Sequence, residues 1–276
     1  MDEKDLIDVA KEATKEIAKD VYQDGGKPIV KPTGELVGLV PRAVKAALFP
    51  LEKWILQKEY NIAETKKLLE EKLQNTPPES IEPPEPHIAV PAIQYISYCM
   101  DNDELRNMYA NLLANSMKKV VKNGVHPGFV EIIKQLSPDE AKILQYMSFE
   151  NRVPTIGLSY EFESGSESIF VNEFSNVPEL TMCENQINCE KYFDNLERLG
   201  LISRSVDRWI SNESVYEPLK NHNFIKNKYS IMEKTSKNMK EFKRISYKKG
   251  FCDLTSFGKA FCSICLDPIN TITITL

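Results

Sequence analysis

The chain has 276 residues, of which 42% are hydrophobic and 27% charged. These fractions are typical of globular proteins and exclude a collagen-like, wholly disordered or membrane-embedded chain. The formal net charge is −5, so the molecule as a whole is not a polycation that coats nucleic acid or anionic lipid. Any basic site must therefore be local.

The sequence carries no signal for export or membrane insertion. Apolar runs such as Leu36 to Pro41 reach only six residues, whereas a membrane-spanning helix needs about 20. The segment Met1 to Asp5 is acidic and lacks the basic and apolar regions of a secretory signal. Six cysteines in so long a chain do not resemble the disulfide framework of a small secreted domain. We therefore predict a cytoplasmic protein with reduced thiols.

Helical periodicity predicts an amphipathic helical region over residues 1–74. Apolar residues recur at steps of three or four from Asp5 to Tyr22, and again from Gly34 to Leu56, where two prolines predict a kink. A third charged segment, Ala63 to Gln74, continues the pattern. This region is expected to be helical throughout, apart from the glycine-containing turn after Tyr22.

A proline-rich segment separates this region from the centre of the chain. Six prolines between Asn75 and Pro91 predict an extended linker over residues 75–91. The central region, 92–136, then contains a strong helical pattern from Asp101 to Lys119 and a shorter one from His126 to Leu136. Ser137-Pro138-Asp139-Glu140 combines an N-cap serine with a glutamate three residues later, which predicts the start of another helix.

The remaining chain, 137–276, is predicted to be a separate α+β domain. Beyond Phe149 its segments become shorter and more β-like. The predicted elements are strands at Arg152–Phe162 and Ser168–Phe174, a helix at Asn185–Leu199 ended by Gly200, strands at Leu201–Val206 and Arg244–Leu254, and a helix at Thr255–Cys265. A largely polar stretch from Asp207 to Lys243 separates the last two strands.

Two stretches carry a family resemblance. Asp103 to Met117, followed by Val125 to Glu140, resembles the signature region of the bacterial abortive-infection alpha (Abi-alpha) family, which is linked to phage defence. Leu254 to Phe261 resembles that family's closing motif, and the match runs from about Gly34 to Cys265. The resemblance implies a defence role in which an infected cell stops growing or dies before phage is released. It supplies no catalytic residues.

A second resemblance concerns the fold. Leu196 to Ile202, a strand, a long excursion, a second strand and Leu254 to Gly258 resemble the helix-to-wing passage of winged-helix domains. The sequence therefore predicts a mainly α protein, in which a helical N-terminal and central region is followed by a C-terminal α+β winged-helix-like domain. Winged helices bind DNA or proteins, so the fold alone does not decide the ligand.

Catalytic and metal-binding motifs are weak. None of His87, His126 and His222 has a nucleophile at a recognisable spacing, and there is no glycine-rich phosphate loop, HExxH or GxSxG. Cys262 and Cys265 have the spacing of a zinc or redox pair but lack a second pair, which favours packing as small apolar side chains. We predict a non-enzymatic protein without metal or small-molecule cofactor; the alternative is an unrecognised nuclease-type enzyme.

The most uneven charge lies between Lys220 and Lys249, where ten basic residues and two acidic ones give a net charge of +8. Interleaved aromatic residues suit a segment that contacts phosphates and stacks on bases. The competing interpretation is a solvated or protein-binding loop. The residues predicted to bind nucleic acid are Lys191, Arg198 and Arg204 beside the candidate recognition helix, and Lys226, Lys228, Lys243 and Lys248 as phosphate contacts.

The segment Gly34 to Leu56 offers a membrane-active alternative. Arg42, Lys45, Phe49 and Trp54 accompany a wide apolar face that could lie in a membrane interface. The competing interpretation is that this face packs on the first helix. The expected partners are thus a nucleic acid or a phage or host protein trigger, with a membrane surface as the alternative, and homo-oligomer formation stays open.

Overall fold

The computed structural model describes residues 62–150, 152–187, 189–206 and 208–267. The helices predicted at 5–22 and 34–56 lie outside the described residues, as do Arg42, Lys45, Phe49 and Trp54 of the membrane-binding alternative. The chain divides into two compact units. Of the described residues, unit 1 holds 62–134 and 264–267, and unit 2 holds those from 135 to 263.

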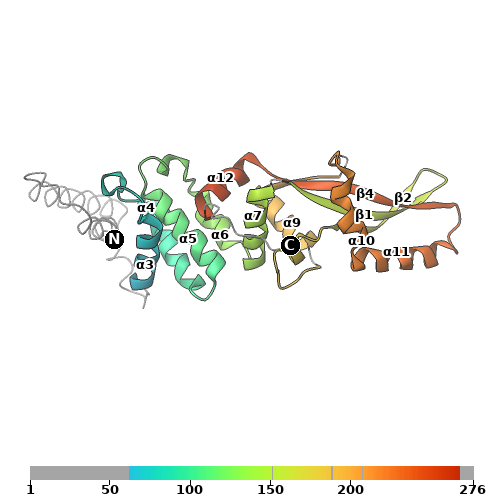
Figure 1. Cartoon of the computed structure of the whole chain (residues 1–276), viewed down its shortest axis with the longest axis horizontal. Coiled ribbons are helices and arrows are strands. Elements are labelled where there is room, and N and C mark those ends of the chain that lie inside the picture. Colours follow the sequence, from blue (N-terminus) through green and yellow to red (C-terminus); the bar gives the residue numbers. More distant parts are fainter. Residues whose placement is uncertain (1–61, 151, 188, 207, 268–276) are drawn as a thin grey trace, which may run out of the picture. The chain divides into compact units, whose positions relative to one another are not determined.

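The described part of unit 1 is helical (Figure 1). Its helices are α3 (Ile62–Leu73), α4 (Pro86–Ile96), α5 (Asp103–Ser116) and α6 (Gly128–Lys134), joined by the short helical turns η1 (Pro78–Ser80), η2 (Ser97–Cys99) and η3 (Lys122–Gly124). Helix α5 packs against α3, α4 and α6. Its buried side chains include Leu112 and Leu113, which the helical periodicity predicted to face a core.

Unit 2 is built around a four-stranded antiparallel sheet in the order β2-β1-β4-β3. Its elements are α7 (Pro138–Glu150), β1 (Arg152–Phe162), β2 (Glu167–Phe174), α8 (Val177–Leu180), α9 (Cys189–Arg198), β3 (Ile202–Ser205), η4 (Glu213–Tyr216), α10 (Glu217–Asn221), α11 (Asn223–Ser236), β4 (Phe242–Leu254) and α12 (Ser256–Cys265). The two long strands β1 and β4 pair from Arg152↔Asp253 to Phe162↔Phe242. The predicted strands at 152–162 and 168–174 are confirmed.

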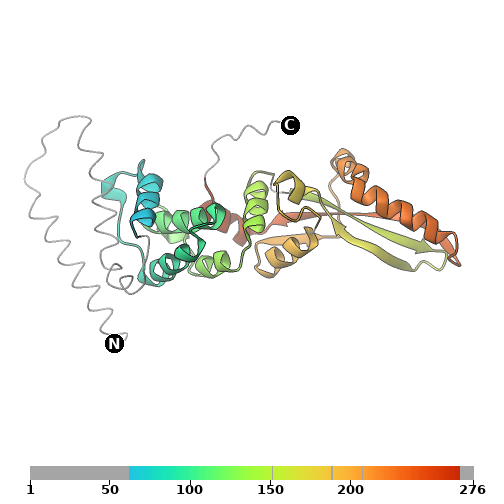
Figure 2. The same ribbon diagram turned by 90° about the horizontal axis from the view of Figure 1, so that it is seen from below.

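Helix α11 lies along one face of this sheet (Figures 1 and 2). Tyr229 of α11 stacks on Tyr247 of β4, with ring centroids 5.7 Å apart, and Phe224 stacks on Phe174 of β2 at 5.1 Å. Because side chains alternate between the faces of a strand, Cys252 of β4 points to the opposite face. Helix α9 reaches that face through Glu197, which is bonded to Arg204 of β3.

Local sequence signals set several helix ends. The Asn102 side chain accepts a hydrogen bond from the Leu105 amide at 2.9 Å, which caps α5. The Ser137 hydroxyl accepts from the Glu140 amide at 3.2 Å, and the Glu140 carboxylate accepts from the Ser137 amide at 2.6 Å, so the predicted capping box of α7 is confirmed. Gly200 has φ +72°, as predicted for the glycine that ends α9.

The predicted fold class is wrong. The chain is a mixed α+β protein with a curled four-stranded antiparallel sheet, not a mainly α protein with a winged helix. The expected wing would pair β3 with β4, but β3 pairs only with the last residues of β4, from Ile202↔Leu254 to Ser205↔Phe251. On its other side β4 pairs with β1 almost throughout, from Arg152↔Asp253 to Phe162↔Phe242, because the two strands are of similar length.

The polar stretch between the last two strands is also largely structured. It contains η4, α10 and α11, and it buries Tyr216, Leu219, Ile225 and Met232. These apolar residues are widely spaced between lysines and asparagines, so the amphipathic pattern of α11 is weak in the sequence. In a winged-helix domain the stretch between these two strands would be a loop. Here it contains α11, the helix that covers one face of the sheet.

Candidate nucleic-acid interface

The stretch Asp103 to Met117, which resembles the family signature, forms hydrogen bonds to the C-terminal end of α12. The side-chain amide of Asn111 on α5 donates a hydrogen bond to the Cys265 carbonyl at 3.2 Å, and that of Asn115 donates to the Ile264 carbonyl at 2.7 Å. These carbonyls belong to the last turn of α12, where no backbone amide within the helix can satisfy them. Asn111 and Asn115 therefore cap the C-terminal end of α12.

The stretch Leu254 to Phe261, which resembles the closing motif, contains the start of α12 and bonds it to the turn after α9. The Thr255 amide donates to the Leu201 carbonyl at 3.0 Å, and the Thr255 hydroxyl donates to the Gly200 carbonyl at 2.6 Å. A Cβ on Gly258 would lie 1.9 Å from the Leu201 carbonyl oxygen, so only glycine fits this approach. Both family-like stretches thus have structural roles around α12.

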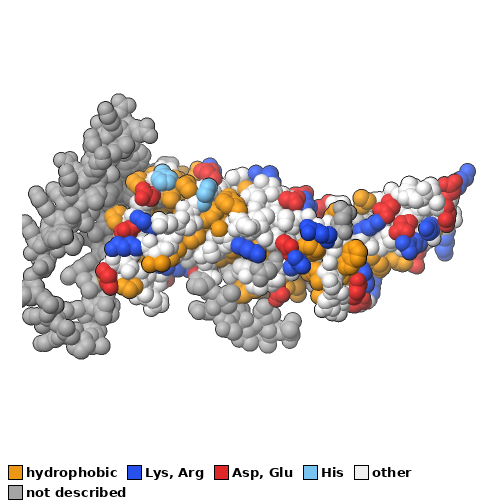
Figure 3. All heavy atoms as spheres, turned by 90° about the horizontal axis from the view of Figure 1, so that it is seen from above, with side chains coloured by type: hydrophobic (Ala, Val, Ile, Leu, Met, Phe, Trp, Pro, Cys, Tyr) orange, Lys and Arg blue, Asp and Glu red, His pale blue; other side chains and the backbone are white. Residues whose placement is uncertain are grey.

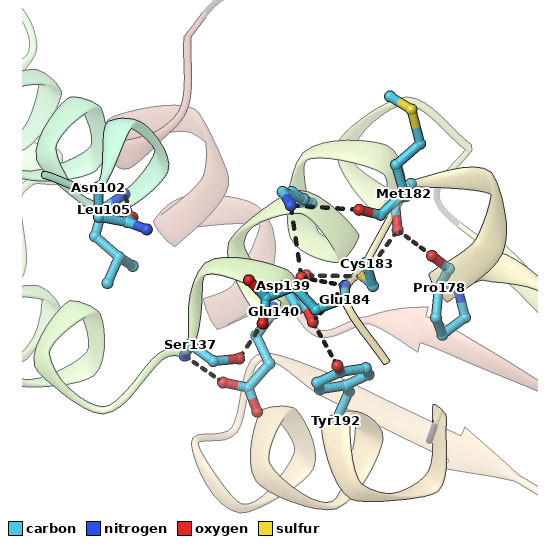
Figure 4. A network of polar contacts seen from close by, with 12 residues as sticks. Asn102, Leu105, Ser137, Asp139, Glu140, Pro178, Met182, Cys183, Glu184 and Tyr192 are labelled. Atoms are coloured by element: carbon cyan, nitrogen blue, oxygen red, sulfur yellow. Dashed lines mark hydrogen bonds and ion pairs between the residues drawn. The ribbon is translucent and has the colours of Figure 1, made fainter. Parts of the chain in front are cut away.

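A buried carboxylate anchors the loop between α8 and α9 (Figure 4). Asp139 of α7 accepts hydrogen bonds from the Tyr192 hydroxyl at 2.5 Å and from the Glu184 amide at 3.1 Å, and lies 3.5 Å from the Lys142 ammonium. Burial opposes ionisation of Asp139, but these hydrogen bonds and the Lys142 charge outweigh it and hold its pKa below the ordinary value. In the same loop Met182 has φ +51° and points outward.

Arg204, predicted to contact nucleic acid, is bonded within the protein. Its guanidinium lies 3.2 Å from the Glu173 carboxylate, 2.6 Å from that of Glu197 and 2.8 Å from that of Asp194. Glu173 is the most buried of these carboxylates; burial raises its pKa, and Arg204 opposes that shift. Three carboxylates surround one guanidinium, so Arg204 joins α9, β2 and β3 and is poorly placed to contact a phosphate.

The other residues predicted to bind nucleic acid differ in how many contacts they make within the protein. Arg198 donates hydrogen bonds to Asn195 and Gln135, and Lys248 of β4 forms an ion pair with Glu167 of β2, across the intervening strand β1. The Lys228 ammonium lies 5.4 Å from the centre of the Phe224 ring and 5.8 Å from that of Phe170. Lys191 is exposed on α9.

Carboxylates outside residues 220–249 neutralise part of the +8 charge of this segment. Arg244 pairs with Glu161 of β1, Lys249 with Glu213 of η4, and Lys220 with Glu217 of α10. Figure 3 shows the result over the strand-rich part of unit 2, where Lys and Arg side chains (blue) lie beside Asp and Glu side chains (red). The net charge of +8 counted from the sequence is therefore larger than the charge that the folded segment presents to a ligand.

Five lysines of the segment keep their charge available. We call them the basic segment; all are exposed, and none forms an ion pair with another described residue: Lys226, Lys234, Lys237, Lys240 and Lys243. Lys226 and Tyr229 lie three residues apart on α11, so their side chains occupy neighbouring positions on the helix surface. The Tyr229–Tyr247 pair thus lies beside one of these lysines.

His222 and the two cysteines of α12 have structural contacts. The His222 Nδ1 accepts from the Phe224 amide at 3.2 Å, which caps α11, and its Nε2 lies 2.9 Å from the Glu179 carboxylate. Cys262 and Cys265 are both buried, and burial raises the pKa of Cys262 to about 12. Within the described ranges, no group of three or more His, Cys, Asp or Glu residues is arranged to hold a metal ion.

Comparison with known proteins identifies the family. The model of the family described as "Abortive infection alpha" matches residues 57–265, which is most of the chain. The chain belongs to this family. None of the curated proteins matches it. An uncharacterized protein from the hydrocarbon-degrading marine bacterium Alcanivorax borkumensis SK2 has a solved structure that is 15% identical, with a TM-score of 0.34; the match covers 49% of this chain and 90% of that one.

Family membership points to abortive infection and phage defence. Across residues 62–267, apart from the three undescribed positions, no helix is both long and apolar enough to cross a membrane.

Proposed function

We propose that this chain is a non-enzymatic, cytoplasmic abortive-infection protein that acts by binding, and that unit 2 recognises nucleic acid through the basic segment. Membership of the abortive infection alpha family supports the defence role. The observation that carries the binding proposal is the set of five exposed lysines without a carboxylate partner among the described residues; one of them, Lys226, neighbours Tyr229 of the Tyr229–Tyr247 pair on α11.

The chemistry of this surface suits a polyanion. Each exposed ammonium that contacts a phosphate releases condensed counterions, so binding is favoured at low salt and independent of base sequence. Lys234 and Lys237 lie in and just after the last turn of α11, and Lys240 and Lys243 follow within six residues. This spacing places several positive charges within a short length of chain, as a nucleic-acid backbone requires.

The test is fluorescence anisotropy of labelled DNA and RNA oligonucleotides with the full chain across a salt series. Changing Lys226, Lys237 and Lys243 to Glu should weaken binding at least tenfold and reduce the salt slope by about 2 to 3, since each lost phosphate contact removes about 0.7 to 0.9 of it. The matched control changes Lys66, Lys67 and Lys259, which lie on α3 and α12, to Glu and has the same net charge.

The comparison separates local from general electrostatics. Retained binding in the control with lost binding in the basic-segment variant supports the proposal. Equal losses in both would mean that net charge alone drives association, and no binding by the unchanged protein at low salt would refute the proposal in favour of a protein trigger.

A further inference from the structure

The loop that follows β3 displays a tryptophan to solvent. Trp209 is 60% exposed, and Val206 in the same loop is 69% exposed. The loop is nevertheless held at a fixed place: the Ile210 amide donates to the Tyr216 hydroxyl at 2.8 Å, and that hydroxyl donates to the Gly250 carbonyl of β4 at 3.1 Å. Trp209 therefore lies next to a residue anchored to the sheet through one buried tyrosine.

A positively charged residue, Arg208, directly precedes this tryptophan in the sequence. The Arg208 guanidinium donates to the Ser205 hydroxyl at 2.8 Å and lies 5.9 Å from the centre of the Phe251 ring. It has no carboxylate partner among the described residues. A guanidinium in this state can bind a phosphate in a forked geometry.

This loop continues the surface that carries the basic segment. Tyr247, Lys249 and Phe251 alternate along β4 and so point to the same face of the sheet, the face covered by α11. Tyr247 stacks on Tyr229, and Phe251 lies beneath Arg208. The rise of a strand places the two aromatic positions about 13 Å apart, a distance that a short extended oligonucleotide can span.

We infer that an unpaired base stacks on Trp209 while Arg208 contacts an adjacent phosphate, so that the protein prefers single-stranded nucleic acid. This inference rests on the proposed function and adds the class of ligand to it. An exposed indole offers a π-face that every base can stack on, whatever its sequence. In a duplex the faces of the bases are covered by their neighbours, so Trp209 gains nothing from a paired base.

The intrinsic fluorescence of Trp209 provides the test. The chain has two tryptophans, so a full-length Trp54→Phe protein leaves Trp209 as the sole indole. Titration with an oligothymidylate of about 12 nucleotides should quench its emission, and a duplex of equal length should not. Trp209→Leu should weaken single-strand binding about tenfold and leave duplex binding unchanged, whereas Trp209→Phe should retain most of the preference.

The outcomes distinguish this inference from the proposed function. Binding that depends on the basic segment, but with no quenching and equal affinity for single strands and duplex, would overturn the role of Trp209 and leave the proposed function intact. If neither the single strand nor the duplex binds at low salt, both the inference and the proposed function are overturned. Quenching by the single strand that Arg208→Gln weakens would support the inference, including the phosphate contact.

Discussion

Arg204 on edge strand β3 forms an ion pair with Glu173 on the opposite edge strand β2, with Nη1 and Oε2 3.2 Å apart. The pair reaches across both central strands because Thr155 and Gly250, which face each other there, have small side chains or none. The Glu173 side chain is 6% exposed and that of Arg204 is 20% exposed. The pair therefore joins the edges of the sheet in a largely buried setting.

Removing Arg204 should strongly destabilise the protein. Arg204→Ala would leave Glu173 buried without its cation, which typically costs about 3–5 kcal/mol of unfolding free energy. Urea denaturation followed by circular dichroism measures this cost. The double variant Arg204→Met with Glu173→Leu should recover much of it, since no uncompensated charge stays buried. A single variant as stable as the unchanged protein would show that the pair is dispensable.

The loss caused by Arg204→Ala should also depend on pH. Burial raises the pKa of Glu173, so its stability contribution is full below the unfolded pKa of about 4.3 and is lost as pH rises through the folded pKa. Without Arg204 the folded pKa should rise further. The gap in unfolding free energy between the variant and the unchanged protein should thus be smaller at pH 5 than at pH 7.

Asp139 should show the opposite pH dependence. Its folded pKa lies below the ordinary value, so its contribution is present above the unfolded pKa of about 3.9 and is lost as pH falls through the folded pKa. Asp139→Asn should cost about 1–3 kcal/mol at pH 7, because the Tyr192 hydroxyl and the Glu184 amide lose a charged acceptor. The denaturation midpoints of the Asp139→Asn variant and the unchanged protein should therefore converge below pH 4. A difference between them that stays constant with pH would contradict this account.

Gly258 tests the packing of α12 on the turn after α9. Replacing a helical glycine by alanine usually stabilises a helix by about 0.5–1 kcal/mol, but here the new methyl group would meet the Leu201 carbonyl oxygen. We expect Gly258→Ala to destabilise the protein by about 1–3 kcal/mol, as overpacking does. The control is Gly124→Ala, whose Cβ would make only an ordinary contact of 3.7 Å with Ile264. Thermal unfolding that ranks the two variants equally would disprove the steric argument.

Local signals in the sequence predicted local structure well. The capping box at Ser137 and the left-handed Gly200 that ends α9 each depend on residues a few positions apart, and both are confirmed. The two long strands were also predicted, because their β-branched and aromatic residues mark them in isolation.

Long-range pairing was beyond the reach of these signals. The neighbour of β4 is set by matching lengths in β1, some 90 residues away, so the order of the sheet and the absence of a wing could not be derived from either strand. For the same reason Arg204 was expected to be free for phosphate, since Glu173 lies 31 residues away along the chain. Lys248 and Lys249, which pair with carboxylates of other elements, were likewise indistinguishable in the sequence from the lysines of the basic segment.

The most direct test of the account joins binding to defence. Cells that express the unchanged protein, the variant with Lys226, Lys237 and Lys243 changed to Glu, or the control with Lys66, Lys67 and Lys259 changed to Glu are challenged with a phage against which the unchanged protein lowers the yield. The measurement is the number of phage released per infected cell. We predict that the control lowers this number as the unchanged protein does and that the basic-segment variant, folded and equally abundant, does not. Equal protection by both variants would contradict a defence mechanism that depends on nucleic-acid binding at the basic segment.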